Sequence, residues 1–404
     1  MKSLKELFKI GNGPSSSHTI GPKMAAQQFL ERNKDALRFK VSLYGSLALT
    51  GKGHFTDKAI LDVLQPAAPT VIDWQPQTVL PFHTNGMTFR AEFSDKEPVE
   101  WTVYSVGGGS LAEAPDAKQK WLEEEREVYP FASMSEIMEW CDKNGRAFWE
   151  VVLEYEGEDI FSYLGNVWKT MKLSVERGLD KEGVLPGPIH LPRKASTYHT
   201  KASAYKPNLQ SRGLVFSYAL AVSEENAAGG IIVTAPTCGS CGVLPAVLYH
   251  AHKSHEFSEV KILRALATAG LFGNVVKRNA SLSGAEVGCQ GEIGVASAMA
   301  AAAVCQLFGG SNAQIEYAAE MGLEHHLGMT CDPVCGYVLI PCIERNAFAA
   351  ARALDAELFA LFSDGRHRVS FDRVVKVMKQ TGHDIPSLYK ETAEGGLAKE
   401  YFDA

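Results

Sequence analysis

Five of the eight cysteines of this 404-residue chain lie in one stretch, residues 283–345. They are Cys289, Cys305, Cys331, Cys335 and Cys342. Cys289, Cys331 and Cys342 each fall at a turn or at the predicted start of a helix, close to glycine or proline. Backbone N–H groups at such positions favour the thiolate over the thiol and lower the thiol pKa. Because the thiolate is the form that binds metal, these three residues are candidate metal ligands.

Two interpretations of this stretch are open from the residues alone. One is a buried alanine-rich helical hairpin in which the cysteines are small apolar side chains. The other is a metal or iron–sulfur site. The spacing Cys289-x41-Cys331-x10-Cys342 matches no compact zinc or ferredoxin pattern, so spacing by itself does not decide between them.

A second group of chemically capable residues stands near the start of the chain. Four hydroxyl side chains and a histidine follow Gly13-Pro14 and precede a predicted helix at 22–32; they are Ser15, Ser16, Ser17, His18 and Thr19. Hydroxyls and free N–H groups at a helix start form an anion cradle, which favours a carboxylate or phosphate site. The alternative is an ordinary multi-serine helix cap. His54 lies in a glycine-flanked loop, a position that by itself usually indicates the surface.

Two further motifs carry weaker signals. Cys238-Gly239-Ser240-Cys241 is a CxxC, but no thioredoxin-like pattern surrounds it, so a glycine-rich loop before a helix at 243 is the simpler interpretation. His250, His252 and His255 are predicted to lie on the surface, because their spacing is poor for metal ligation.

Length and composition define the class of protein. The net charge of −7 indicates no basic surface for nucleic acid. The N-terminal residues lack the apolar segment of a signal peptide, and the longest apolar run, 298–305, is too short to span a membrane. We therefore expect a cytoplasmic protein with reduced cysteines, no membrane span and no nucleic-acid partner.

The hydrophobic pattern changes once along the chain. Strands are predicted at 38–49, 70–74, 87–93 and 100–105, whereas helices are predicted at 258–276, 290–308, 312–327, 341–363 and 370–380. A capping box at Ser133-x-x-Glu136 opens the helical part, and a long amphipathic pattern follows at 147–177 with weak points at Gly157 and Gly165. Residues 178–210 are predicted to be irregular. The expected fold is α+β: a small N-terminal α+β domain, residues 1–132, followed by a larger all-helical catalytic domain, residues 133–404.

Five motifs together resemble the bacterial iron–sulfur-dependent L-serine dehydratases. They are GPSSSHT at 13–19, KGH at 52–54, SGAEVGCQGE at 283–292, TCDP at 330–333 and PCIERN at 341–346. The resemblance covers nearly the whole chain in order. It implies an α+β domain joined to a helical catalytic domain, a [4Fe–4S] cluster, usually a homodimer, and conversion of L-serine to pyruvate and ammonia.

The resemblance also implies roles for individual residues. The three cluster ligands would be Cys289, Cys331 and Cys342, leaving Cys305 and Cys335 as bystanders. His54 would be the base, with His18 as a second catalytic residue. The substrate pocket would be lined by Ser15, Ser16, Ser17, Thr19 and Lys52.

Two departures from the family pattern are visible. Some members place at the extreme C-terminus a cysteine that can cap the cluster, whereas this chain ends Tyr401-Phe402-Asp403-Ala404. Many members have APTNGAAG where this chain has APTCGSCG at 235–242. We therefore expect no terminal cysteine cap.

Three other functions fit parts of the pattern. A pyridoxal phosphate enzyme runs the same reaction, but Lys52 and Lys201 lack the glycine-rich phosphate cup of an α/β fold. A regulatory protein with a structural zinc would also use turn-placed thiols. A relative acting on cysteine or another β-substituted amino acid would share the cluster ligands but not the side-chain pocket.

Overall fold

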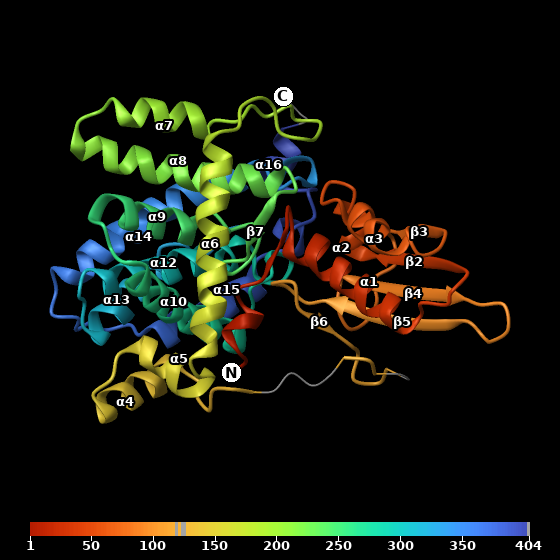
Figure 1. Cartoon of the computed structure of the whole chain (residues 1–404), viewed down its shortest axis with the longest axis horizontal. Helices are drawn as coiled ribbons and strands as arrows, with labels where there is room; N and C mark the ends of the chain where they lie inside the picture. Colours follow the sequence, from red (N-terminus) through yellow and green to blue (C-terminus); the bar gives the residue numbers. More distant parts are fainter. Residues whose placement is uncertain (118–119, 123–126, 402–404) are drawn as a thin grey trace.

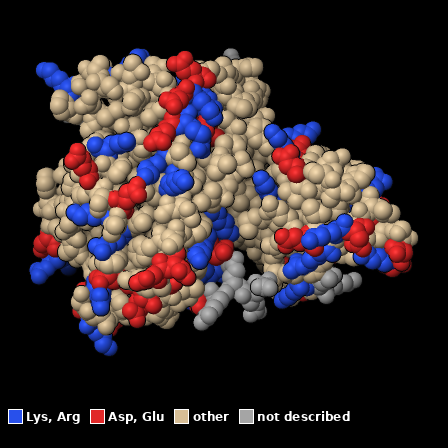
Figure 2. Space-filling view, viewed as in Figure 1, with Lys and Arg blue, Asp and Glu red and all other residues tan. Residues whose placement is uncertain are grey.

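The computed structural model describes residues 1–117, 120–122 and 127–401. Figure 1 shows a sheet-containing domain, coloured red to orange, beside a larger body of helices. This arrangement confirms the predicted α+β class with a small N-terminal domain and a larger helical one. No helix of the described residues is both long enough and apolar enough to cross a bilayer. On the face shown in Figure 2, acidic and basic side chains are interspersed.

The small domain is built on one five-stranded sheet with the strand order β3-β2-β4-β5-β6. Its elements are α1 (Gly21–Arg32), β2 (Arg38–Tyr44), α2 (Gly45–Thr50), α3 (Thr56–Leu64), β3 (Thr70–Gln75), β4 (Gly86–Glu92), β5 (Val99–Ser105) and β6 (Leu111–Ala112). Strands β2 and β3 are parallel because α2 and α3 form the crossover between them, and the other pairs are antiparallel. Alternate residues of β2, including Phe39 and Val41, pack into the domain core.

The predicted strand 38–49 is too long by five residues. The chain leaves the sheet after Tyr44 and forms α2, which carries the run Leu47–Leu49. A short apolar run fits either a strand or a helix by pattern, so only packing decides it.

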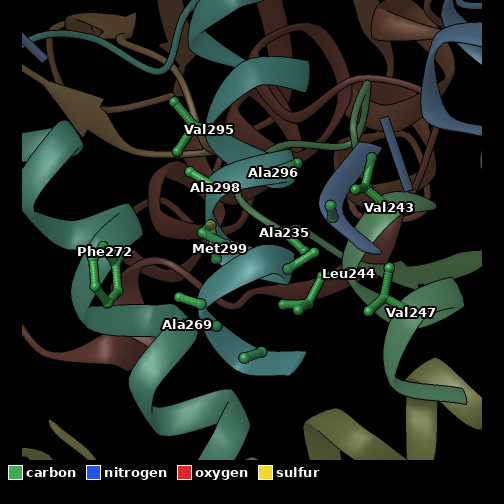
Figure 3. Close-up of a cluster of buried hydrophobic side chains, with 14 of the residues drawn as sticks. Ala235, Val243, Leu244, Val247, Ala269, Phe272, Val295, Ala296, Ala298 and Met299 are labelled. Carbon is green, nitrogen blue, oxygen red and sulfur yellow. The ribbon is translucent and has the colours of Figure 1, made fainter. Parts of the chain in front are cut away.

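The helical domain surrounds one alanine-rich helix, α12. Its helices are α4 (Met134–Asn144), α5 (Phe148–Glu156), α6 (Asp159–Leu179), α7 (Ala195–Ser203), α8 (Pro207–Ala227), α9 (Val243–His255), α10 (Glu259–Asn279), α11 (Gly284–Val287), α12 (Ile293–Leu307), α13 (Asn312–Glu324), α14 (Cys342–Leu361), α15 (Phe371–Asp384) and α16 (Gly396–Glu400). All residues of α12 except Gln306 are buried, because α9, α10, α13 and α14 pack around it. Figure 3 shows Met299 of α12 in this core with Phe272 of α10 and Leu244 of α9. The small alanine side chains let the neighbouring helices approach closely.

The pattern at 147–177 is helical as predicted and divides at the expected weak point Gly157, whose φ of +74° ends α5, whereas α6 continues through Gly165. Two sequence-based predictions in this domain are wrong. The region 178–210 contains α7, whose only buried residues are Ala195 and Ala202, so its apolar pattern is weak. His250 is buried, because α8 covers its side of α9 and Ser211 bonds its Nε2 at 2.9 Å.

The first twenty residues pack with the helical domain. β1 (Ile10–Asn12) pairs antiparallel with β7 (Ile231–Val233), and the Met1 ammonium donates to the Tyr129 carbonyl at 2.6 Å. The side chain of Phe8 lies in the helical core. The chain therefore passes from the helical domain into the small domain at Ser15–Thr19. The predicted domain boundary at residue 132 stays a prediction.

A pH-dependent stability is expected from Glu357 of α14. Glu357 is 7% exposed and lines a cavity of about 360 Å³. Burial raises the pKa of its carboxyl from 4.5 to about 7. The other titratable groups lining this cavity are His250, His255 and the ion pair Arg212–Asp355.

Because the unfolded chain releases the Glu357 proton at lower pH than the folded chain, wild-type stability should fall as pH rises from about 4.5 to 7. The substitution Glu357→Gln should remove this loss, worth on the order of 3 kcal/mol between pH 5 and pH 8. Urea unfolding at both pH values measures it, with the exposed Glu139→Gln as control. Equal pH dependence in wild type and Glu357→Gln would refute the assignment.

A candidate active site between the two domains

Three thiols meet at the junction of the domains. Cys289 lies in the turn after α11, Cys331 in the loop after α13, and Cys342 is the first residue of α14; all three are buried. The sulfurs of Cys289 and Cys331 and a carboxylate oxygen of Glu292 all lie within 4.8 Å of one another. Burial and then the neighbouring Cys289 raise the pKa of the Cys342 thiol, so this thiol lies in the same region, outside the tight group of Cys289, Cys331 and Glu292. Folding thus brings two of the predicted metal ligands together and places the third nearby.

One arginine balances the charge of this group. Arg345 lies one turn after Cys342 on α14, and its Nη1 donates to the Thr330 carbonyl at 2.7 Å. The pKa of Cys289 is lowered mainly by a hydrogen bond from Cys331, with the charge of Arg345 adding to the effect. The sequence motif contained Arg345, but sequence reasoning assigned it no role.

The thiols need close backbone packing. A Cβ on Gly284 would lie 3.0 Å from the Cys331 sulfur and 2.9 Å from a carboxylate oxygen of Glu292, so a side chain there would displace both groups. Thr237 Oγ1 donates to Glu292 Oε1 at 2.7 Å and fixes the carboxylate beside the thiols.

The remaining cysteines stay outside this group. Cys305 is buried within α12, and burial raises its pKa to about 12. Cys335 is half-buried in the turn Val334–Gly336. Burial also raises the pKa of the thiols of Cys238 and Cys241, which keeps the CxxC pair protonated and unreactive.

Two neutral histidines form a second buried group at the domain junction. His18 sits in the π-helical turn Ser16–Ile20 and His54 in the loop between α2 and α3, with ring centroids 4.6 Å apart. Both side chains are buried, and burial lowers the pKa of His18 to about 4 and that of His54 well below 6.5. No group among the described residues forms a hydrogen bond with the buried Nδ1 of His54. A buried, neutral imidazole with a free nitrogen is equipped to accept a proton.

The serine-rich loop holds these histidines in place. Ser17 Oγ lies 2.8 Å from His18 Nδ1, and Ser46 Oγ lies 3.1 Å from His18 Nε2. Ser15 Oγ accepts from the His18 backbone N–H at 3.1 Å, and Thr19 Oγ1 donates to the His54 carbonyl at 2.7 Å. Several of the hydroxyls predicted to bind an anion therefore also have a structural task.

The structure does not bring Lys52 to this site. Lys52 is exposed, and its ammonium lies 5.7 Å from the centre of the Trp74 ring. The other predicted residues of the loop, Ser15 to Thr19, are all buried at the domain junction.

Sequence reasoning missed one residue that joins the two groups. A ring nitrogen of His18, a ring nitrogen of His54 and a carboxylate oxygen of Glu391 all lie within 4.8 Å of one another. The Glu391 backbone N–H also donates to the Cys331 carbonyl at 2.7 Å. Burial raises the pKa of the Glu391 carboxyl well above 4.5, and Glu292 adds to the effect. The acidic, glycine-containing C-terminal sequence carried no signal for this role.

Comparisons with known proteins agree with this architecture. Residues 3–77 match the family model "Serine dehydratase beta chain", and residues 80–398 match "Serine dehydratase alpha chain". The chain is 41% identical to "L-serine dehydratase 1" of Escherichia coli over 448 aligned positions, covering 98% of this chain and 99% of that protein. It is 41% identical to the L-serine dehydratase of Streptomyces coelicolor, with 98% of each chain covered. It is 38% identical to that of Helicobacter pylori, again with 98% of each chain covered. With both domain models matched in order and relatives aligned from end to end, this chain belongs to the serine dehydratase family.

Proposed function

We propose that this protein is an L-serine dehydratase that converts L-serine to pyruvate and ammonia by α,β-elimination. The observation that carries the proposal is that a buried group of Cys289, Cys331 and Glu292 is linked through Glu391, whose backbone N–H donates to the Cys331 carbonyl, to two neutral histidines. Its full-length relatives are named L-serine dehydratases.

We further propose that Cys289, Cys331 and Cys342 hold a [4Fe–4S] cluster. Support comes from the Cys289 and Cys331 sulfurs, which lie within 4.8 Å of each other, from the Cys342 thiol, whose pKa is raised by burial and by Cys289, and from the absence of another described cysteine in the group. Such a donor set fits an iron–sulfur cluster better than a four-ligand structural zinc. When bound, the cluster supplies a Lewis acid at the iron that lacks a cysteine ligand, which weakens the bond from the substrate β-carbon to its hydroxyl.

The protein's own residues then carry the proton. His54 takes the α-proton of L-serine on its free Nδ1, and the electron pair of that bond forms the double bond as hydroxide leaves. The His18 ring lies beside the His54 ring, and the hydroxyls of Ser17 and Ser46 fix its orientation. The product, 2-aminoacrylate, tautomerises to an imine that water hydrolyses to pyruvate and ammonia. Ser15, Ser16, Ser17 and Thr19 form the wall that faces the substrate carboxylate.

The first experiment measures iron and acid-labile sulfide in anaerobically purified protein, with pyruvate release from L-serine followed in the same sample. About four irons and four sulfides per chain together with pyruvate support both proposals. Zinc without sulfide and no pyruvate would overturn both and leave the zinc-containing regulatory protein as the better explanation.

We also propose a cytoplasmic homodimer. Eight free cysteines suit a reducing compartment. Phe348, Leu358, Phe359 and Phe362 are all exposed on one side of α14, and Phe362 is 84% exposed. Exposed aromatic side chains of this size favour an interface, although the exposed Arg352 and Asp355 lie among them. A second copy is the proposed occupant.

The double substitution Phe359→Glu with Phe362→Glu should convert the dimer to a monomer, because two buried carboxylates per subunit would lack cationic partners. Light scattering coupled to size-exclusion chromatography measures the mass. Val79→Glu, at an exposed apolar position of the small domain, serves as the control and should stay dimeric. A dimer that survives the double substitution would place the interface elsewhere.

A further inference from the structure

We propose that Glu391 binds the α-ammonium group of the substrate. This inference rests on the proposed function, since it names the residue that recognises one part of L-serine. It adds a substrate-binding residue from the C-terminal segment to a site otherwise built from the serine loop, the His54 loop and the cysteine loops.

The first argument is that Glu391 has no lysine or arginine partner among the described residues, although its carboxyl also has a backbone hydrogen bond from Ala285. Its side chain is 12% exposed, and its ion-pair contact among the described residues is with His18 Nδ1 at 3.8 Å. Because both ring nitrogens of His18 already lie within hydrogen-bond distance of hydroxyls, at 2.8 and 3.1 Å, that contact does not satisfy the carboxylate. No lysine or arginine within the described part of the chain reaches Glu391 closely enough for an ion pair. A carboxylate removed from water needs a cation or several donors, and an ammonium group supplies both.

The second argument is the shape of an α-amino acid. The nitrogen and the α-hydrogen are attached to the same carbon, so the group that holds the nitrogen must lie beside the base that removes the hydrogen. Glu391 lies within 4.8 Å of His54, the residue with the free ring nitrogen. On its other side, the Glu391 backbone is bonded to Cys331. The Glu391 carboxylate thus lies near the proposed base, and its backbone is bonded to a proposed cluster ligand. The α-carbon of the substrate must sit next to this carboxylate.

The third argument is that Glu391 is held rigidly. The Cys331 N–H donates to the Tyr389 carbonyl at 2.8 Å, and the Glu391 N–H donates back to the Cys331 carbonyl at 2.7 Å. Lys390 Nζ donates to the Gly382 carbonyl at 2.8 Å. Glu391 has φ +59°, a conformation that costs free energy for a residue with a side chain and persists where the surroundings enforce it. The segment around Glu391 therefore holds its carboxylate in one position beside His18 and His54.

A metal ion is a poorer occupant of the same three residues. Two histidines and a carboxylate can bind a divalent cation. Here, however, metal binding through His18 would require loss of a hydrogen bond to Ser17 or Ser46. An ammonium group would instead bind the Glu391 carboxylate and leave both hydrogen bonds of the His18 ring in place.

The test compares Glu391→Gln and Glu391→Asp with the wild-type enzyme, using Glu394→Gln, three residues along and exposed, as the matched control. Steady-state kinetics with L-serine are combined with inhibition by ethanolamine, which keeps the ammonium group, and by 3-hydroxypropanoate, which lacks it. Glu391→Gln should raise the KM for L-serine about 100-fold and weaken ethanolamine similarly, while 3-hydroxypropanoate is unaffected. Glu391→Asp should recover part of the loss, and iron and sulfide should be unchanged in all variants.

Each departure from this pattern has a distinct meaning. Equal weakening of both inhibitors, or a fall in kcat at constant KM, would overturn the ammonium role. A KM for L-serine that is no lower in Glu391→Asp than in Glu391→Gln would also overturn the ammonium role. This comparison holds even if neither inhibitor binds the wild-type enzyme. Loss of iron in Glu391→Gln would assign the residue a structural role in the cysteine loop. A wild-type enzyme without turnover of L-serine would instead defeat the proposed function itself.

Discussion

Alanine at Cys289, Cys331 or Cys342 is expected to abolish both the bound iron and the turnover of L-serine. Each thiol would supply one of three corners of the cluster, and the three sulfurs come from separate loops that no other described cysteine reaches. Metal affinity depends on every ligand, so two remaining thiols should not retain the cluster. Iron, acid-labile sulfide and visible absorption of anaerobically purified protein measure the loss, and pyruvate release should fall at least about 1,000-fold, the loss of the Lewis acid.

Cys305→Ala is the matched control for this series. It also removes a buried thiol, but its sulfur lies inside α12 and is not part of the thiol group. Iron content and activity should stay near wild type. Unchanged iron in any of the three ligand variants would show that the corresponding cysteine is not a ligand.

His54→Ala is expected to lower kcat about 1,000-fold while the cluster remains. General-base catalysis contributes about 10²- to 10⁴-fold, and the free Nδ1 of a buried, neutral His54 is placed to provide it. The His54 ring packs against His18 and is not part of the group formed by Cys289, Cys331 and Glu292, so iron and sulfide should not change. Single-turnover pyruvate formation and iron content, measured on the same preparation, separate the two effects.

His250→Ala provides the comparison, because His250 is also buried with a pKa lowered to about 4 but lies in the cavity beside α8. It should lose stability without losing kcat. Near-normal kcat in His54→Ala would transfer the base role to another group, and His18 would be examined next.

Local sequence determined most of the elements. The capping residue Ser133 accepts the N–H of Glu136, the third residue of its helix, as its sequence motif predicted. Alternating burial in β2 and the alanine-rich run of α12 likewise follow from patterns a few residues long. The errors, such as the end of the strand at Tyr44 and the helix at Ala195–Ser203, occur where the local pattern is weak and packing decides.

The expectation about the C-terminal cysteine cap could not be compared with the structure, since residues 402–404 lie outside the described residues. Residues 118–119 and 123–126 also lie outside the described residues.

The sequence by itself determined which residues have the chemistry for this site, because thiols at turns and hydroxyls at a helix start keep their character wherever the fold places them. Only the tertiary structure decided which of them meet. It joined His18 and His54 to the distant cysteines through Glu391, gave Arg345 a position beside the thiols, and left Lys52 at the surface. These outcomes depend on contacts between residues hundreds of positions apart, and such contacts are set by the packing of two domains and leave no periodic trace in the chain.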